Sequence, residues 1–136
     1  MDPRISIVTL GVADLAVSTA FYRDGLGWPY LADKSGEGIS FFEVNHGTLW
    51  LALYPRPLLA EDAQVPDGPA GFSGFTLAQL ARDRDEVNLL MDKALAAGAK
   101  ITKAPQQVFW GGYSGYFADP DGFLWEVAFN PYSWFE

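Results

Sequence analysis

The sequence contains no cysteine, so its 136 residues form no disulfide bond and use no thiol as a nucleophile or metal ligand. Basic residues are also scarce: 9 Lys and Arg stand against 17 Asp and Glu, which gives a formal net charge of −8. That balance argues against binding to nucleic acid or to an anionic membrane surface, because both require basic patches. No apolar run has membrane-spanning length and the N-terminus has no signal-peptide pattern, so we expect a cytoplasmic protein.

Histidine occurs only once, at His46. It lies in Asn45-His46-Gly47, a sequence typical of a turn between two strands. Such a turn holds the imidazole at the end of a hairpin, away from the floor of a site built on a sheet. The chain also has no pattern of a Ser/His/Asp triad, a phosphate-binding glycine loop or a nucleotide-binding fingerprint. The common sequence signatures of catalysis are therefore missing.

Apolar and aromatic residues are abundant instead. Hydrophobic side chains make up 49% of the chain and charged ones only 19%, a composition that excludes a disordered protein. A chain of 136 residues with this content is expected to form one domain with a core of its own. Aromatic residues account for 15%, and several stand beside glycine or turn residues. At those positions the sequence fits a pocket wall or a subunit interface as well as it fits a core.

One order of elements occurs twice along the chain. Residues 5–10 are a strand-like run, and Asp14 is placed to cap a following helix that reaches Tyr22 and is stopped by Gly25 and Gly27. Residues 72–80 are a second strand-like run, followed by a helix that we expect Asp85 to cap and Gly98 to end. The apolar face of the second helix has helical spacing and consists of Val87, Leu90, Met91 and Ala94.

The strands that follow the two helices match as well. The run at 50–55 stands 75 positions before the run at 125–129, and each run begins with Trp and ends near a Pro. This alignment pairs Leu51 with Glu126. We therefore predict two βαβββ modules within a single domain, residues 1–136. Their expected bounds are 1–59 for module one, 60–69 for a linker rich in Pro, Asp, Gly and Ala, and 70–136 for module two.

Residues 113–131 are the most specific segment. Asp119-Pro120-Asp121-Gly122 has the residue types of a tight type I turn, and apolar strand-like runs flank it, so we predict a β-hairpin. The second run contains one carboxylate, Glu126. Strand alternation places Glu126 on the same face as Leu124 and Ala128. An unpaired carboxylate is costly to bury, so Glu126 either faces solvent or lies in a polar pocket.

This hairpin resembles the closing hairpin of the vicinal oxygen chelate superfamily, which includes glyoxalases, bleomycin-resistance proteins, fosfomycin-resistance enzymes and extradiol dioxygenases. The opening segment 8–15, together with Phe21-Tyr22 and Gly25-Leu26-Gly27, is similar to the first strand and helix of that family. The resemblance covers nearly the whole chain. It implies an α+β fold in which two βαβββ modules form a curved, cup-like mixed sheet with the active site in its concavity.

In metal-using relatives the residue that matches Glu126 is a metal ligand. The resemblance places the other ligands on the first strand of each module and on the last strand of module one. The matching residues in this sequence are Ile7, Phe75 and Leu51, whose side chains cannot coordinate a metal. One carboxylate does not hold a divalent ion against water, because metal sites need several converging ligands. We therefore expect no metal and no cofactor.

The polar groups of the expected ligand site are Glu126, Tyr116 and Gln79. The resemblance matches Tyr116 to a substrate-contacting Tyr of fosfomycin-resistance enzymes, and a core tyrosine is the alternative. Gln79 points into the cup if its strand extends that far, and otherwise it is a polar residue at a strand end. The segment Trp110-Gly111-Gly112-Tyr113 either lets a ligand approach the backbone or forms a simple bulge. The expected walls of the cup are Phe75, Leu51, Ile7, Trp110 and Tyr113.

These features predict a metal-independent protein of the bleomycin-resistance type that binds a small aromatic or cationic molecule. The alternative is an enzyme of the same superfamily, a lyase, isomerase or dioxygenase-like protein. Such an enzyme would use Glu126 as an acid or base, or as part of a shifted metal site with Gln79. A scaffold protein with a vestigial cup is a third interpretation. We also expect a homodimer, because residues 131–135 place three aromatic side chains at the chain end and the resemblance implies paired subunits.

Overall fold

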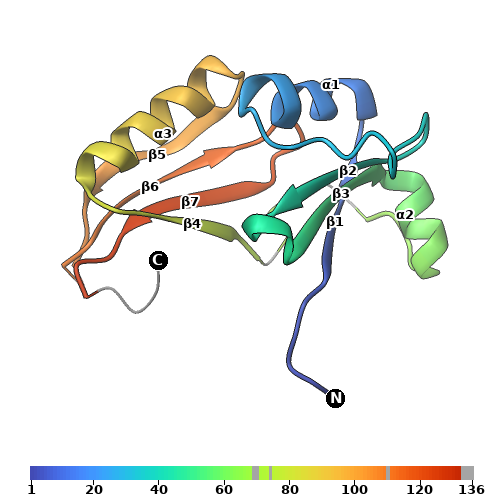
Figure 1. Cartoon of the computed structure of the whole chain (residues 1–136), viewed down its shortest axis with the longest axis horizontal. Coiled ribbons are helices and arrows are strands. Elements are labelled where there is room, and N and C mark those ends of the chain that lie inside the picture. Colours follow the sequence, from blue (N-terminus) through green and yellow to red (C-terminus); the bar gives the residue numbers. More distant parts are fainter. Residues whose placement is uncertain (69–70, 74, 110, 133–136) are drawn as a thin grey trace. The chain divides into compact units, whose positions relative to one another are not determined.

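The computed structural model describes residues 1–68, 71–73, 75–109 and 111–132. The chain divides into two compact units, Met1–Ala70 and Gly71–Glu136. Each unit contains a mixed β-sheet with helices packed against it (Figure 1), which confirms the predicted α+β fold class. None of the helices in the described ranges is long and apolar enough to span a membrane.

The first unit follows the predicted order of elements with two differences. The strand expected directly after the helix is reduced to a single bridge between Tyr30 and Phe42. The segment 60–69, expected as a linker, begins inside helix α2. The strands have the order β1-β3-β2, with β1 parallel and β2 antiparallel to β3. The elements are β1 (Ile7–Val12), α1 (Leu15–Ala20), a π-helical turn (Phe21–Gly25), β2 (Ser40–Val44), a 3₁₀ turn (Asn45–Gly47), β3 (Leu49–Pro55) and α2 (Arg56–Ala63).

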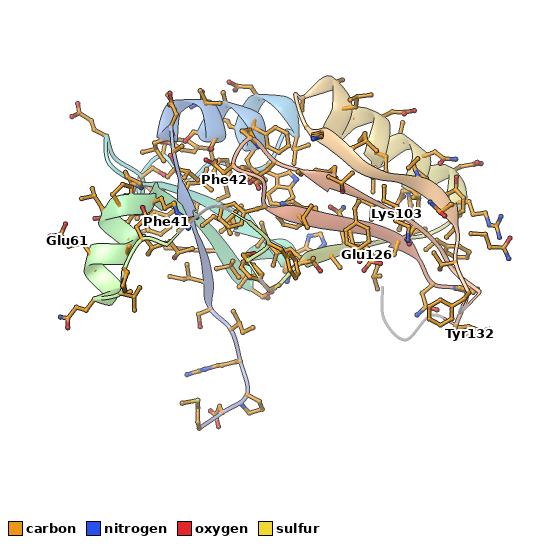
Figure 2. The ribbon with its side chains drawn as sticks, turned by 180° about the vertical axis from the view of Figure 1, so that it is seen from behind. Phe41, Phe42, Glu61, Lys103, Glu126 and Tyr132 are labelled. Atoms are coloured by element: carbon orange, nitrogen blue, oxygen red, sulfur yellow. The ribbon has the colours of Figure 1, made fainter. Side chains whose placement is uncertain are left out.

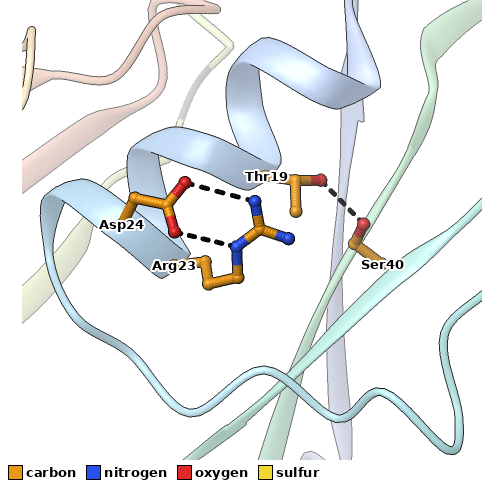
Figure 3. Close-up of polar contacts among 4 residues, drawn as sticks. All are labelled: Thr19, Arg23, Asp24 and Ser40. Carbon is orange, nitrogen blue, oxygen red and sulfur yellow. Dashed lines mark hydrogen bonds and ion pairs between the residues drawn. The ribbon is translucent and has the colours of Figure 1, made fainter.

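Helix α1 begins as the sequence predicts. The carboxylate of Asp14 accepts a hydrogen bond of 3.1 Å from the backbone N–H of Val17, which caps the first turn. A buried hydrogen bond of 2.7 Å joins the hydroxyls of Thr19 in α1 and Ser40 in β2 (Figure 3). The same view shows the exposed ion pair between Arg23 and Asp24, which contributes little to stability because water screens it.

The hydrogen bond between Thr19 and Ser40 shows which face of the first sheet α1 covers. Ser40 pairs with Leu53, so every second residue from these positions lies on the covered face. That face forms the core of the unit, and its central members are at most 2% exposed: Leu10, Phe42, Leu51 and Leu53. The opposite face, which we call the open face of the first sheet, carries Ile7, Thr9, Phe41, Trp50 and Ala52.

The second unit has the complete βαβββ order. Its strands have the order β4-β7-β6-β5, with β4 parallel to β7 and the other pairs antiparallel. Strand β4 begins at Leu77 and not at residue 72, where Gly71 and Gly74 flank the expected start and weaken strand formation. The elements are β4 (Leu77–Ala81), α3 (Arg84–Ala96), β5 (Lys100–Gln107), β6 (Tyr113–Ala118) and β7 (Leu124–Phe129).

The expectation that Asp85 caps α3 is wrong. Asp83 is the cap: its backbone is extended, and its carboxylate accepts a hydrogen bond of 2.8 Å from the N–H of Glu86. Asp85 lies in the first turn, where its negative charge still favours the positive end of the helix dipole. The apolar face of α3 is as predicted, because Val87, Met91 and Ala94 are buried.

Helix α3 covers one face of the second sheet. Gly115 in β6 faces it, since a Cβ at this position would lie 3.0 Å from the Met91 Cε and 2.9 Å from the Lys103 carbonyl oxygen. Phe117 and Trp125 share that face and stack with ring centroids 6.3 Å apart. The opposite face, which we call the open face of the second sheet, therefore carries Tyr116 and Glu126.

The predicted hairpin is confirmed. The N–H of Gly122 donates to the carbonyl of Asp119, which closes the four-residue turn, and Gly122 has the positive φ of 85° that glycine adopts most easily. The buried carboxylate of Asp119 accepts hydrogen bonds of 2.9 Å from the N–H groups of Asp121 and Phe123. The turn thus fixes the register of β6 and β7 and makes Tyr116 the direct partner of Glu126.

Candidate functional site

The open face of the second sheet holds a row of polar side chains on three neighbouring strands. Lys103 in β5 pairs with Tyr116 in β6, and Tyr116 pairs with Glu126 in β7. Ala78 in β4 completes the row beside Glu126. Cross-strand partners share a face of the sheet, so the side chains of Lys103, Tyr116 and Glu126 project from the same surface. Figure 2 labels Lys103 and Glu126 on this sheet. We call these three residues the polar row.

Tyr116 and Glu126 are coupled. The two residues are direct cross-strand partners on β6 and β7. Partial burial raises the pKa of the Tyr116 phenol above its ordinary value of 10.0, and the charge of the neighbouring Glu126 and hydrogen bonding toward its carboxylate raise that pKa further. Tyr116 therefore keeps its proton at neutral pH and acts as a donor. Both side chains are half-buried, so a ligand can reach them.

Two residues expected beside Glu126 lie on the other face of the second sheet. Gln79 pairs with Val127, and Ala78, not Gln79, is the partner of Glu126. The expectation that Gln79 shares a face with Glu126 is therefore wrong. Tyr113 also points toward α3: its hydroxyl donates a hydrogen bond of 2.7 Å to Asn88, and the guanidinium of Arg84 lies 5.2 Å from its ring centroid. Tyr113 supports the helix and not a site on the open face.

Leu51 is a third residue on the opposite face from the one expected. It pairs with Val8 and Phe42 on the face that α1 covers and is only 2% exposed, so it belongs to the core. Ile7 does lie on the open face of the first sheet, where it pairs with Trp50 and is 48% exposed. Its neighbour Trp50 packs against Phe41 with ring centroids 5.4 Å apart. These two aromatic residues were not predicted as part of a site.

Phe75 and Trp110 complete the expected residues. The sequence pattern placed Phe75 on the first strand of module two. In the structure Phe75 precedes β4 and does not occupy a strand position. Its ring is 46% exposed and lies against Phe123, with centroids 6.3 Å apart. Trp110 lies outside the described residues. The turn at Asn45–Gly47 is confirmed, and His46 is exposed there.

Lys103 was missed because strand alternation does not predict its position. The register of β5 against β6 shifts between Ile101 and Lys103 and again between Lys103 and Gln106. Each irregularity breaks the simple alternation of faces along the strand. A lysine in a strand-like run gave no signal of its own, and only the pairing with Tyr116 identifies it.

The neighbours of Glu126 on the second sheet do not complete a divalent metal site. Its neighbours in the row are a phenol, an ammonium group and a methyl group, and a carboxylate alone provides too few ligands. No cluster of three or more His, Cys, Asp or Glu side chains that could hold a metal ion occurs within residues 1–68, 71–73, 75–109 and 111–132.

The polar row does not coincide with either of two hollows in the described residues. One of about 350 Å³ lies between α3 and β5, and one of about 330 Å³ lies beside α2. Neither hollow is lined by Tyr116 or Glu126. We place the candidate site at the polar row, because coupled titratable groups indicate function better than open volume does.

Comparison with known proteins agrees with this architecture. A glyoxalase-related enzyme from Fulvimarina pelagi is 35% identical and superposes with a TM-score of 0.84, covering 95% of this chain and 89% of that one. Lactoylglutathione lyase from Agrobacterium tumefaciens is 27% identical with a TM-score of 0.70, and the match covers 100% of both chains. Metallothiol transferase FosB from Lysinibacillus sphaericus is 30% identical over 122 residues, which is 90% of this chain and 79% of that protein. Residues 4–127 match the model of one family, and the chain belongs to the Glyoxalase/Bleomycin resistance protein/Dioxygenase superfamily.

Proposed function

We propose that the protein binds a small aromatic or cationic molecule on the open face of its second sheet. The observation that carries this proposal is the cross-strand pair of Tyr116 and Glu126, in which burial and the charge of Glu126 raise the pKa of the Tyr116 phenol. An apolar surface with a few fixed polar groups is typical of small-molecule sites. The ring face of Tyr116 suits an aromatic group, and the carboxylate of Glu126 suits a cation. The apolar residues beside the pair are Ala78, Leu80, Leu124 and Ala128.

We further propose that this binding is independent of a divalent metal. The support is the chemistry of the side chains next to Glu126, since neither Lys103 nor Ala78 can replace a missing ligand.

An enzyme that uses proton transfer is the second candidate. A carboxylate beside a protonated phenol provides a base and a hydrogen-bond donor for proton transfer on a bound substrate. In this case Glu126 would remove a proton and Tyr116 would stabilise the negative charge that develops. A shifted metal site with Gln79 is not part of this proposal, because Gln79 lies on the other face of the sheet.

Elemental analysis tests metal independence directly. After growth with added Zn²⁺, Ni²⁺, Mn²⁺ and Fe²⁺, we expect far less than one metal ion per purified chain, because Glu126 has no second ligand beside it. About one ion per chain in the wild type that is lost in Glu126→Ala would contradict the proposal. The matched control is Glu61→Ala, which removes an exposed carboxylate in the first unit (Figure 2).

We also propose that the protein is a homodimer. Tyr132 is 63% exposed, and the remaining aromatic residues of the chain end, at 133–136, lie outside the described residues. An exposed aromatic side chain such as Tyr132 favours an interface. Light scattering at micromolar concentration should give twice the mass of the chain, and removal of residues 132–136 should shift the equilibrium toward the monomer. A monomeric wild type would contradict the proposal.

A further inference from the structure

The two ends of the polar row carry opposite charges. Lys103 provides an ammonium group on β5, and Glu126 provides a carboxylate on β7, with Tyr116 on the strand between them. Neighbouring strands lie about 4.8 Å apart, so the backbones of β5 and β7 are separated by about 10 Å at this row. That separation leaves room for a small molecule to extend along the row.

Neither charge is neutralised within the described part of the chain. Lys103 has no ion pair there, and the partner of Glu126 is the phenol of Tyr116, which is uncharged when protonated. The polar row therefore presents an unpaired cation and an unpaired anion on two strands that flank β6.

We infer that the ligand of this face is a zwitterion whose cationic group lies against Glu126 and whose anionic group lies against Lys103. This inference rests on the proposed function and specifies its ligand class. The body of the ligand would lie over the ring of Tyr116, since that residue occupies the centre of the row. A ligand with a positive charge alone would satisfy Glu126 but would leave Lys103 unpaired.

The arrangement also fixes the orientation of the ligand. A zwitterion bound the other way round would place like charges together at both ends of the row, which is unfavourable at each end. The row thus favours a ligand with two opposite charges and fixes the direction in which that ligand lies along the sheet. Complementary charges of this kind improve specificity more than they improve affinity.

Three matched probes test the inference by isothermal titration calorimetry. 4-(Aminomethyl)benzoate carries both charges across an aromatic ring, benzylammonium carries only the positive one, and 4-methylbenzoate carries only the negative one. We expect the zwitterion to bind about tenfold or more tightly than either singly charged probe. This ratio corresponds to one charge-assisted contact of modest strength at the second end of the row.

Substitutions of the two charged residues test which group of the ligand each of them binds. Lys103→Met should reduce the affinity for the zwitterion to that for benzylammonium, and Glu126→Gln should reduce it to that for 4-methylbenzoate. Lys93→Met is the matched control, because it removes the same charge from α3 and should leave all three affinities unchanged. Thermal unfolding midpoints of the variants close to that of the wild type verify that they fold.

The outcomes separate this inference from the proposed function. Equal binding of the zwitterion and benzylammonium, or a zwitterion affinity that Lys103→Met does not change, overturns the inference and leaves cation binding at Glu126 intact. Binding of benzylammonium that Glu126→Gln does not change overturns the proposed site together with the inference. If neither 4-(aminomethyl)benzoate nor benzylammonium binds, the proposed site and the inference are both overturned.

Discussion

Replacing Leu51 by alanine should lower the free energy of unfolding by about 2–5 kcal/mol, the range observed for buried leucines. Leu51 is 2% exposed and packs on the covered face of the first sheet with Phe42. The matched variant is Ile7→Ala, which should lower the free energy of unfolding by about 1 kcal/mol or less, because Ile7 is 48% exposed.

Urea denaturation of the two variants measures both values. The comparison tests the assignment of faces in the first sheet, since Ile7 and Leu51 would be equivalent wall residues if they shared the open face. Similar losses of stability in the two variants would contradict the observed register, in which Ile7 pairs with Trp50 and Leu51 pairs with Val8.

Glu126→Gln should weaken binding of benzylammonium by about tenfold to a hundredfold while the fold is kept. This loss of affinity is the size expected when one hydrogen bond to a charged group is removed. Stability should change by about 1 kcal/mol or less, because the phenol of Tyr116 can donate to the amide oxygen that replaces the carboxylate. Calorimetric titration and urea denaturation measure the two effects separately.

The control for this variant is Glu61→Gln, which makes the same charge change on an exposed position of α2 and should affect neither quantity. Destabilisation of Glu126→Gln by several kcal/mol would show that Glu126 is a paired structural carboxylate, since loss of one partner of a buried pair has an effect of that size. The candidate site would then be wrong.

The fold could be predicted because its signals are local. The residue types of the turn at 119–122 specify the hairpin, and the carboxylate of Asp14 finds its N–H partner three residues along the chain. The buried face of α3 follows from helical spacing alone. Each of these features depends on residues that are neighbours in the sequence.

The faces of the strands were harder to predict, because they depend on pairing between distant segments. The internal alignment matched Trp50 with Trp125, yet Trp50 lies on the open face of its sheet and Trp125 lies on the face covered by a helix. A shift of one position moves every side chain of a strand to the other face. The same shift explains why Leu51 was aligned with Glu126 although it is a core residue.

For the same reason, only part of the candidate site could be predicted. Tyr116 and Glu126 were found because both lie in the hairpin, whose register follows from its own turn. Lys103 could not be found, because two irregularities in β5 decide which of its residues meets Tyr116. Gln79 was placed on the wrong face, because the pairing of β4 with β7, which its own sequence does not specify, puts Ala78 and not Gln79 beside Glu126.

Native mass spectrometry of the protein after incubation with a small-molecule extract of cells is the most direct test of metal-independent ligand binding at Glu126. We predict that the wild type and Glu61→Gln retain an organic molecule and that Glu126→Gln loses it, with no divalent metal ion bound to any of the three. A mass increase equal to one metal ion per chain that is lost in Glu126→Gln, or an organic molecule that all three proteins retain equally, would contradict the proposed site.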